Sequence, residues 1–119
     1  MDDLLKNFAK VREVLQQAKW PGVEEGLSWG TPALTVRGKM LVRIREDNIL
    51  VIRCEMHEKE FLMQAAPDIF FETDHYKGYP AVLAHLDKIG NEELAEQIEK
   101  TWRRLATKKM VELYSARQA

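Results

Sequence analysis

The sequence predicts a two-layer α+β domain in which helices pack on one face of an antiparallel sheet. Apolar residues recur at helical spacing near both ends of the chain. Between these ends, short apolar segments alternate with turns that contain Gly, Asn or Pro. The connections between neighbouring strands are short, which favours antiparallel pairing. Because 119 residues is an ordinary length for one domain, we expect residues 1–119 to form a single domain.

The first element is predicted to be a helix over residues 3–19. Its apolar residues lie three or four positions apart and therefore share one helical face: Leu4, Phe8, Val11, Leu15 and Ala18. Pro21 and Gly22 end this helix. Residues 23–32 contain two glycines, which predicts a loop or a short edge strand.

Three strands are predicted next, over residues 34–36, 39–45 and 49–54. Tight turns at Arg37-Gly38 and Asp47-Asn48 join them, since Gly and Asn tolerate positive φ. Along the second strand, one set of alternate residues is apolar: Met40, Val42 and Ile44. The other set is Leu41, Arg43 and Arg45, so we expect one apolar face and one cationic face.

The second half is predicted to begin with a helix over residues 57–66, whose inward residues are Phe61, Leu62 and Ala65. Strands over 69–72 and 81–86 follow. The last helix starts near Asn91 and buries a stripe that consists of Leu94, Ile98, Trp102 and Leu105. Residues 107–119 either extend this helix or form a frayed tail. The predicted order is helix, three strands, helix, two strands, helix, or α-β-β-β-α-β-β-α.

Composition excludes several classes of protein. Apolar residues make up 45% of the chain and charged residues 31%, which is the balance of a globular protein. Cys54 is the single cysteine, so an internal disulfide and a cysteine-rich metal site are excluded, and its acidic neighbour Glu55 predicts a buried, unreactive thiol. The chain has neither a secretory signal pattern nor an apolar run of ~20 residues, so we expect a cytoplasmic protein with no membrane association.

The histidines and glycines give no sign of a cofactor. His57, His75 and His85 lie too far apart in sequence for ligand spacing on one element. Gly38-Lys39 lacks the remaining residues of a phosphate-binding loop. We therefore expect no metal, no cofactor and no catalytic residue, and we favour a non-enzymatic protein while an enzyme stays open as an alternative.

Charge is distributed unevenly although the net charge is only −1. Residues 45–74 hold eight acids and three bases, whereas residues 100–119 hold six bases and one acid. The middle of the chain is acidic and its end is basic.

Five segments together resemble the MmcQ/YjbR family over nearly the whole chain. They are Ser28-Trp29-Gly30-Thr31-Pro32, Val36-Arg37-Gly38-Lys39, Pro67-Asp68-Ile69-Phe70-Phe71, His75-Tyr76-Lys77-Gly78-Tyr79-Pro80-Ala81-Val82 and Trp102-Arg103. The resemblance implies a small α+β fold similar to a double-wing DNA-binding domain. It implies DNA binding only by analogy of fold, which does not fix function.

The leading functional hypothesis is a small non-enzymatic module that binds nucleic acid, and DNA in particular, weakly. The candidate contacts are basic residues of the strand face and of the C-terminal helix: Arg37, Lys39, Arg43, Arg45, Arg103, Arg104, Lys108 and Lys109. The pI of about 6.3 lies well below the value of ~9 typical of a dedicated nucleic-acid-binding domain, which favours low affinity.

Two alternatives remain. One is a pocket for a small molecule or peptide, conceivably of an enzyme, around Trp29, His75, Tyr76 and Tyr79, because aromatic and polar groups together line ligand sites. A concave pocket that joins the Trp29 and His75 loops would favour it, whereas a flat cationic surface would favour nucleic acid. The other alternative is a protein-interaction adaptor. We expect a monomer.

The loop over residues 74–80 is expected to be ordered. Tyr76 and Tyr79 can pack their rings and bond their hydroxyls, and Pro80 starts the next strand. We expect Gly78 to adopt positive φ.

Overall fold

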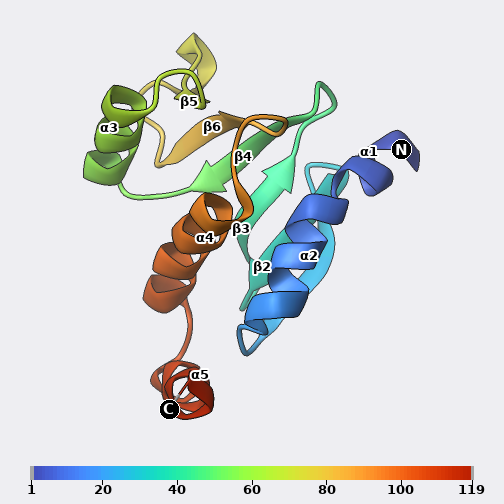
Figure 1. Ribbon diagram of the computed structural model, residues 1–119, viewed down its shortest axis with the longest axis vertical. Helices are drawn as coiled ribbons and strands as arrows, with labels where there is room; N and C mark the ends of the chain where they lie inside the picture. Colours follow the sequence, from blue (N-terminus) through green and yellow to red (C-terminus); the bar gives the residue numbers. More distant parts are fainter. Residues whose placement is uncertain (1, 119) are drawn as a thin grey trace.

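The computed structural model describes residues 2–118 and has the α+β architecture that the sequence predicts (Figure 1). In chain order the elements are α1 (Asp2–Asn7), α2 (Ala9–Ala18), β1 (Val23–Ser28), β2 (Thr31–Val36), β3 (Lys39–Ile44), β4 (Ile49–Arg53), α3 (Met56–Ala65), β5 (Phe70–Phe71), the 3₁₀ turn η1 (Asp74–Tyr76), β6 (Ala81–His85), α4 (Asn91–Leu105) and α5 (Lys108–Gln118). The six strands form one sheet in the order β1-β2-β3-β4-β6-β5, and every neighbouring pair is antiparallel.

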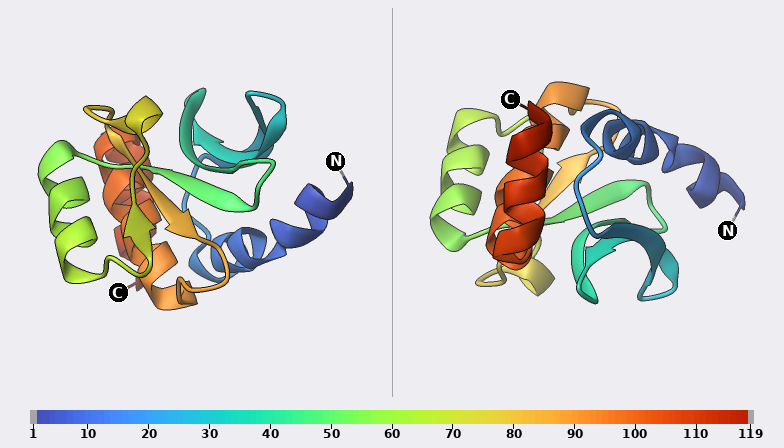
Figure 2. Two further views of the ribbon diagram at one scale, coloured as in Figure 1. Left: turned by 90° about the horizontal axis from the view of Figure 1, so that it is seen from above. Right: turned by 90° about the horizontal axis from the view of Figure 1, so that it is seen from below.

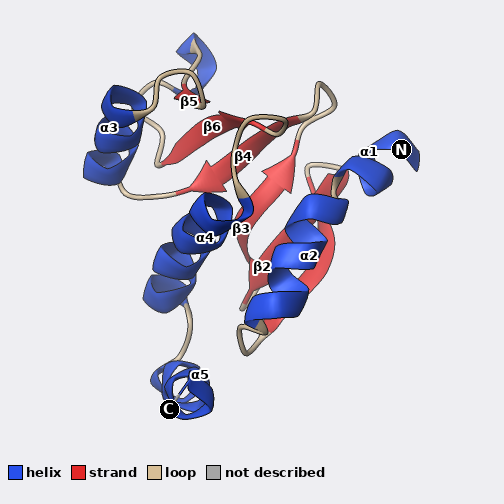
Figure 3. Cartoon of the chain, viewed as in Figure 1, coloured by secondary structure: helices blue, strands red, loops and turns tan. Residues whose placement is uncertain are grey.

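The helices form a second layer against one face of this sheet (Figure 3). Helices α2 and α4 lie side by side and contribute buried residues such as Val11 and Ile98 to the main core. The sheet contributes alternate residues of its central strands, including Ile44, Leu50 and Val82. Burial of this apolar area provides the main driving force for folding.

The helical ladder of the N-terminus continues across the boundary between α1 and α2. Phe8 N–H donates to Leu4 O at 2.9 Å, and Arg12 N–H donates to Phe8 O at 3.0 Å. Phe8 itself is fully buried, as its helical spacing predicts. The single predicted helix is therefore two assigned helices that share one line of hydrogen bonds.

Four strands, not three, precede α3. Residues 23–32 form the edge strand β1 and its turn into β2. Of the two expectations for this segment, a loop or an edge strand, the edge strand is confirmed, and the structure has one strand more than the predicted order. The turn residues Trp29 and Gly30 both have positive φ, at 54° and 78°, as in a type I′ hairpin. Trp is uncommon in the left-handed region, which is why the sequence did not reveal this hairpin.

The predicted alternation along β3 is wrong for Met40 and Leu41. The pairing of β2 with β3 shifts register between Leu34 and Thr35, as in a β-bulge. Leu41 is consequently fully buried in the main core, beside Val42. Met40 instead packs on the opposite face of the sheet. Beyond the bulge, Arg43 and Arg45 keep their predicted face.

Helix α3 is rotated relative to the prediction. Phe61 was expected to lie inward, but it is 69% exposed, and Ala65 is exposed as well. The buried side chains of the helix are Lys59 and Leu62, three residues apart on one face. The polar contacts of Lys59, described below, account for this rotation.

The C-terminal segment forms a helix of its own. Helix α4 ends at Leu105, and α5 lies at one end of the molecule (Figure 1). The Tyr114 ring packs edge-on against Trp102 with 5.1 Å between centroids, and its hydroxyl donates to Glu99 at 2.7 Å. Trp102 is fully buried, as predicted, and its indole N–H donates to Pro21 O at 2.9 Å.

Among the helices of residues 2–118, none is both long enough and apolar enough to cross a membrane.

Candidate nucleic-acid interface on the open sheet face

The face of the sheet turned away from α2 and α4, here called the open face, is curved. Views from above and from below show β1, β2 and β3 curling into a trough whose concave side faces away from α2 (Figure 2). Paired residues share a face, so the open face can be followed across the sheet from Arg43 to Val51, Leu83 and Phe71.

Three arginines lie along the open face, Arg43 and Arg45 in the trough and Arg53 on the adjoining strand β4. Arg43 and Arg53 have strand positions that alternate with core residues, and Arg45 follows β3 directly, with its N–H donating to Ile49 O at 2.8 Å. Because β3 and β4 are antiparallel, Arg53 lies toward the start of β3, where its Nε donates to Met40 O at 2.6 Å. Sequence analysis identified Arg43 and Arg45 but missed Arg53, although the alternation along β4 would have placed it.

Arg43 is a half-buried guanidinium with two protein partners. It donates from Nη1 to Thr31 Oγ1 at 3.0 Å and from Nη2 to the Tyr76 hydroxyl at 3.3 Å. These bonds come from two separate segments of the chain and fix the planar group in place. Arg43 therefore presents a positioned positive charge and retains further N–H donors.

Arg45 is held by a neighbouring acid. Its Nε donates to Asp47 Oδ1 at 3.0 Å, and Nη2 pairs with Asp47 Oδ2. The hydrogen bond from Arg45 lowers the pKa of Asp47, and the same bond raises the pKa of Arg45. Tyr76 also contributes to the raised pKa of Arg45.

Trp29 stands at the edge of the trough. Its side chain is 87% exposed, although both neighbouring strands are well ordered by the β1–β2 ladder. A hollow of about 350 Å³ lies beside it, and its lining residues are Trp29, Thr31, Arg43, Arg45, Glu46 and Asp47. Trp29, which the sequence analysis assigned to a possible pocket, therefore lies beside Arg43 and Arg45, which it assigned to nucleic-acid binding.

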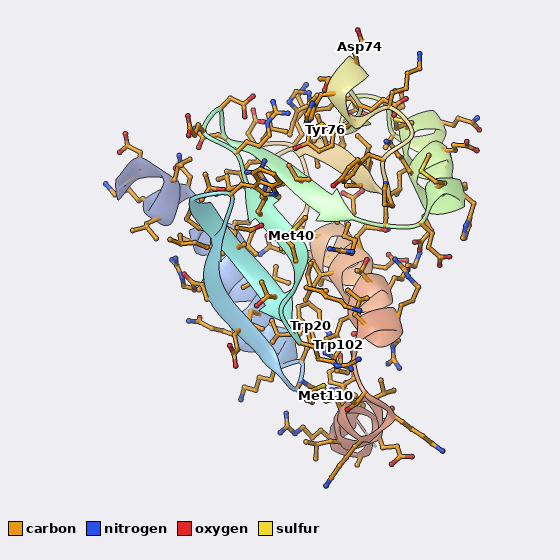
Figure 4. The ribbon with its side chains drawn as sticks, turned by 180° about the vertical axis from the view of Figure 1, so that it is seen from behind. Trp20, Met40, Asp74, Tyr76, Trp102 and Met110 are labelled. Atoms are coloured by element: carbon orange, nitrogen blue, oxygen red, sulfur yellow. The ribbon has the colours of Figure 1, made fainter. Side chains whose placement is uncertain are left out.

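The loop with His75, Tyr76 and Tyr79 covers the other part of the open face (Figure 4). Tyr76 is buried against Val51, Ala81 and Leu83, whereas Tyr79 is 56% exposed. The Tyr76 ring has edge contacts to His75 at 5.0 Å and to Tyr79 at 5.9 Å. The loop contains the 3₁₀ turn η1, and Gly78 has the predicted positive φ, at 76°.

Lys59 of α3 binds this loop through its main-chain carbonyls. Its ammonium is buried, with Nζ 2.6 Å from Tyr76 O, 2.9 Å from Tyr79 O and 2.8 Å from Glu72 Oε2. An ammonium has three donors, and each of these has an acceptor here. Sequence analysis missed Lys59, because a lysine between Glu58 and Glu60 is typical of an exposed helix face.

The remaining predicted basic residues lie elsewhere. Arg37 and Lys39 lie at the far end of β3, where Arg37 Nη1 donates to Leu105 O at 3.2 Å, next to the exposed Lys108 and Lys109 of α5. Arg103 pairs with Glu99 at 3.2 Å. Arg104 pairs with Glu58 at 3.1 Å and with Glu55 at 3.4 Å. The eight basic residues therefore divide between the open face, the α5 end and the helical layer.

Metal binding and thiol chemistry are the other two possibilities considered for residues 2–118. Within residues 2–118, no three His, Cys, Asp or Glu side chains are grouped as a metal site would require. Cys54 is buried, and burial raises the pKa of its thiol to about 11. The hollow beside Trp29 does not include His75, Tyr76 or Tyr79.

The chain and its fold are similar to those of known proteins. The chain is 30% identical to uncharacterized protein Rv2570 of Mycobacterium tuberculosis and to uncharacterized protein Mb2600 of Mycobacterium bovis, over 97% of this chain and 95% of each relative. Its fold is similar to the crystal structure of Deinococcus radiodurans protein DR2400, with a TM-score of 0.67 and 19% identity over 88% of this chain and 85% of that one. The YjbR family model matches residues 18–104, and the chain belongs to the YjbR family.

Proposed function

We propose that the protein is a non-enzymatic binding module whose open sheet face binds single-stranded nucleic acid weakly. The observation that carries this proposal is the placement of the exposed Trp29 beside Arg43 and Arg45 in one trough. Non-specific single-strand binding combines a positively charged groove with aromatic side chains on which bases stack.

The arginines supply the contacts to phosphate. Arg45, Arg43 and Arg53 follow one another along the open face, and a strand advances by about 3.3 Å per residue. Planar guanidinium groups bind phosphate oxygens through paired N–H donors. Hydrogen bonds from Arg43 to Thr31 and Tyr76 fix its orientation before a ligand arrives, which lowers the entropy cost of binding.

Trp29 supplies the stacking surface. Its indole has almost no contact with the rest of the protein, since 87% of the residue is exposed. An exposed aromatic ring offers a flat surface on which a base can stack. A base that stacks on this ring would leave its phosphate within the arginine trough.

Low affinity follows from the charges around the trough. Glu46 and Asp47 line the same hollow as the arginines, and Asp47 already occupies Arg45. The chain as a whole has a net charge of −1. Only a few phosphates can be neutralised, so binding is expected to decline steeply as salt rises.

Fluorescence anisotropy with a labelled oligothymidine of about twelve nucleotides tests the proposal, since site sizes of this class are about 4–16 nucleotides. Titrations at several salt concentrations should give a slope of log K against log salt near −2, at about −0.7 for each of three phosphate contacts. The duplex of the same length should bind more weakly, because the stacking surface needs unpaired bases.

Variants separate stacking from charge. Trp29→Asn keeps a residue that tolerates positive φ and should weaken binding roughly tenfold, whereas Phe61→Ala removes another exposed ring, from the helical layer, and should not. Arg45→Gln should reduce the salt slope by about 0.7, whereas Lys100→Gln, in α4, should leave it unchanged. Equal losses in each variant and its control would refute the assignment.

A small aromatic anion is the second candidate for the same hollow. The volume of about 350 Å³ beside Trp29, Arg43 and Arg45 is large enough for one such ring. A nucleoside monophosphate that competes with the oligonucleotide at equal strength per nucleotide would favour this candidate, because a polymer gains affinity from several contacts.

A further inference from the structure

A groove between α3 and α4 lies on the helical layer, away from the open face. Its volume is about 640 Å³, within the range of roughly 300–1,000 Å³ that is usual for binding sites. The groove lies between Phe61 and Leu62 of α3 on one side and Gln97 of α4 on the other. Phe70 and the alanines that end α3 complete its apolar part.

Phe61 gives this groove an unpartnered aromatic wall. The side chain belongs to a well-formed helix with a capping box, yet the residue is 69% exposed. The neighbouring Leu62 is buried in the main core, so Phe61 is not needed to hold α3 on the sheet. An exposed aromatic ring beside an apolar hollow is the usual anchor point of a protein–peptide contact.

Gln97 provides a second, independent observation. The residue is 94% buried, as its exposed fraction is 6%, and it lines the groove. Within residues 2–118 the side-chain amide of Gln97 makes no hydrogen bond. Every side-chain N or O atom in this part that is sealed from solvent does have a hydrogen-bond partner, so the unbonded amide of Gln97 is not sealed. The amide of Gln97 therefore opens into the groove, with donors and an acceptor free for a ligand.

The rim of the groove is acidic. Glu58, Glu93 and Glu96 line it, and Lys100 is the one cation among its lining residues. Lys100 already pairs with Glu96 at 3.6 Å and Arg104 pairs with Glu58 at 3.1 Å, so within residues 2–118 Glu93 is the groove glutamate without a cationic partner. The negative rim selects against acidic occupants and attracts basic ones.

From these features we propose that the groove between α3 and α4 binds a short basic peptide segment of a partner protein. A bulky apolar side chain of the peptide packs between Phe61 and Phe70. A main-chain amide group of the peptide donates to and accepts from the Gln97 amide, whose donor and acceptor complement it. Flanking lysines or arginines of the peptide lie against Glu93 and Glu96. This site is separate from the proposed nucleic-acid face.

The test uses two synthetic peptides and NMR titration of the isotope-labelled protein. One probe is a capped hexapeptide with a central phenylalanine–leucine pair between two pairs of lysines, and the other carries glutamates in place of the lysines. The lysine probe should shift resonances of α3 and α4 with an affinity in the range of weak peptide recognition, roughly 10–500 µM. The glutamate probe should shift none.

Variants complete the test. Phe61→Ala removes an exposed ring, and Gln97→Leu keeps the side-chain volume while it removes the amide. Each should weaken the lysine probe roughly tenfold, whereas Trp29→Asn should leave its affinity unchanged. If Gln97→Leu fails to fold, Glu96→Gln replaces it and should weaken the probe by about threefold.

Three results would overturn the proposal. The first is no shift with the lysine probe at about millimolar concentration, the weak limit of useful affinity. The second is equal binding to wild type and Phe61→Ala. The third is self-association of the wild type that Phe61→Ala abolishes, because the groove would then be covered by a second copy of the chain.

Discussion

Lys59→Met is the substitution that most directly tests how the loop over residues 74–80 is held. The wild-type ammonium is 1% exposed and lies within 2.9 Å of three oxygens, two carbonyls and one carboxylate. Methionine has similar length but no donor. The carboxylate of Glu72 would lose its partner, whereas Tyr76 O and Tyr79 O would each lose one of two donors and keep a backbone N–H, from Tyr79 and Ala81 respectively.

The expected loss of stability can be worked from these contacts. A hydrogen bond to a charged group contributes about 1.5–3 kcal/mol, but each carbonyl keeps its backbone donor and so loses only part of its hydrogen bonding. Loss of one partner of a buried ion pair costs about 3–5 kcal/mol when both are sealed from water. The Glu72 side chain is 27% exposed and can regain water, so the ion-pair contribution is smaller. We expect Lys59→Met to lower the free energy of unfolding by about 2–4 kcal/mol.

Urea denaturation followed by tryptophan fluorescence measures this loss, with Lys100→Met as the matched control. Lys100 also pairs with a glutamate, at 3.6 Å, but its side chain is 49% exposed, and such a pair contributes little. A loss below about 0.5 kcal/mol in Lys59→Met, equal to that of a typical surface change, would refute the role of Lys59.

Four further predictions concern the core and the turns. Trp102→Ala should lower the free energy of unfolding by about 3–5 kcal/mol, because the ring is fully buried against Tyr114; an unchanged urea midpoint would contradict this. Gly78→Ala should cost about 1 kcal/mol through its φ of 76° alone, since no atom lies within 4 Å of the added Cβ; a thermal melt equal to wild type would show that the strain is relieved. Cys54, whose thiol pKa burial raises to about 11, should resist a thiol reagent in the folded protein and react on unfolding. Since the unfolded thiol loses its proton first, Cys54 should also make the fold less stable as pH rises from its ordinary pKa of 9.0 toward 11, and a stability that rises over this interval would contradict that assignment.

Periodicity predicted those parts of the fold in which side chains follow simple spacing. The buried stripe of α4 and the open-face position of Arg43 both follow from the pattern of apolar residues along one element. The ordered loop with positive φ at Gly78 follows from glycine's conformational freedom. These features depend on local sequence and so were accessible from it.

Long-range contacts set the features that the sequence did not reveal. The register shift that buries Leu41 depends on how β2 pairs with β3, and the rotation of α3 depends on oxygens that Lys59 meets about 20 residues away. Trp29 occupies a turn position that normally carries Gly or Asn, so its hairpin lacked the usual signal. The candidate site could therefore be identified by residue but not assembled from the sequence.

NMR titration with the oligothymidine is the sharpest test of nucleic-acid binding at the open face, because it locates binding residue by residue. We expect shifts to concentrate on the Trp29 indole N–H and on the side-chain N–H groups of Arg43, Arg45 and Arg53, and to decline as salt rises. Shifts confined to Arg37, Lys108 and Lys109 at the α5 end, or no shifts at low salt, would contradict it.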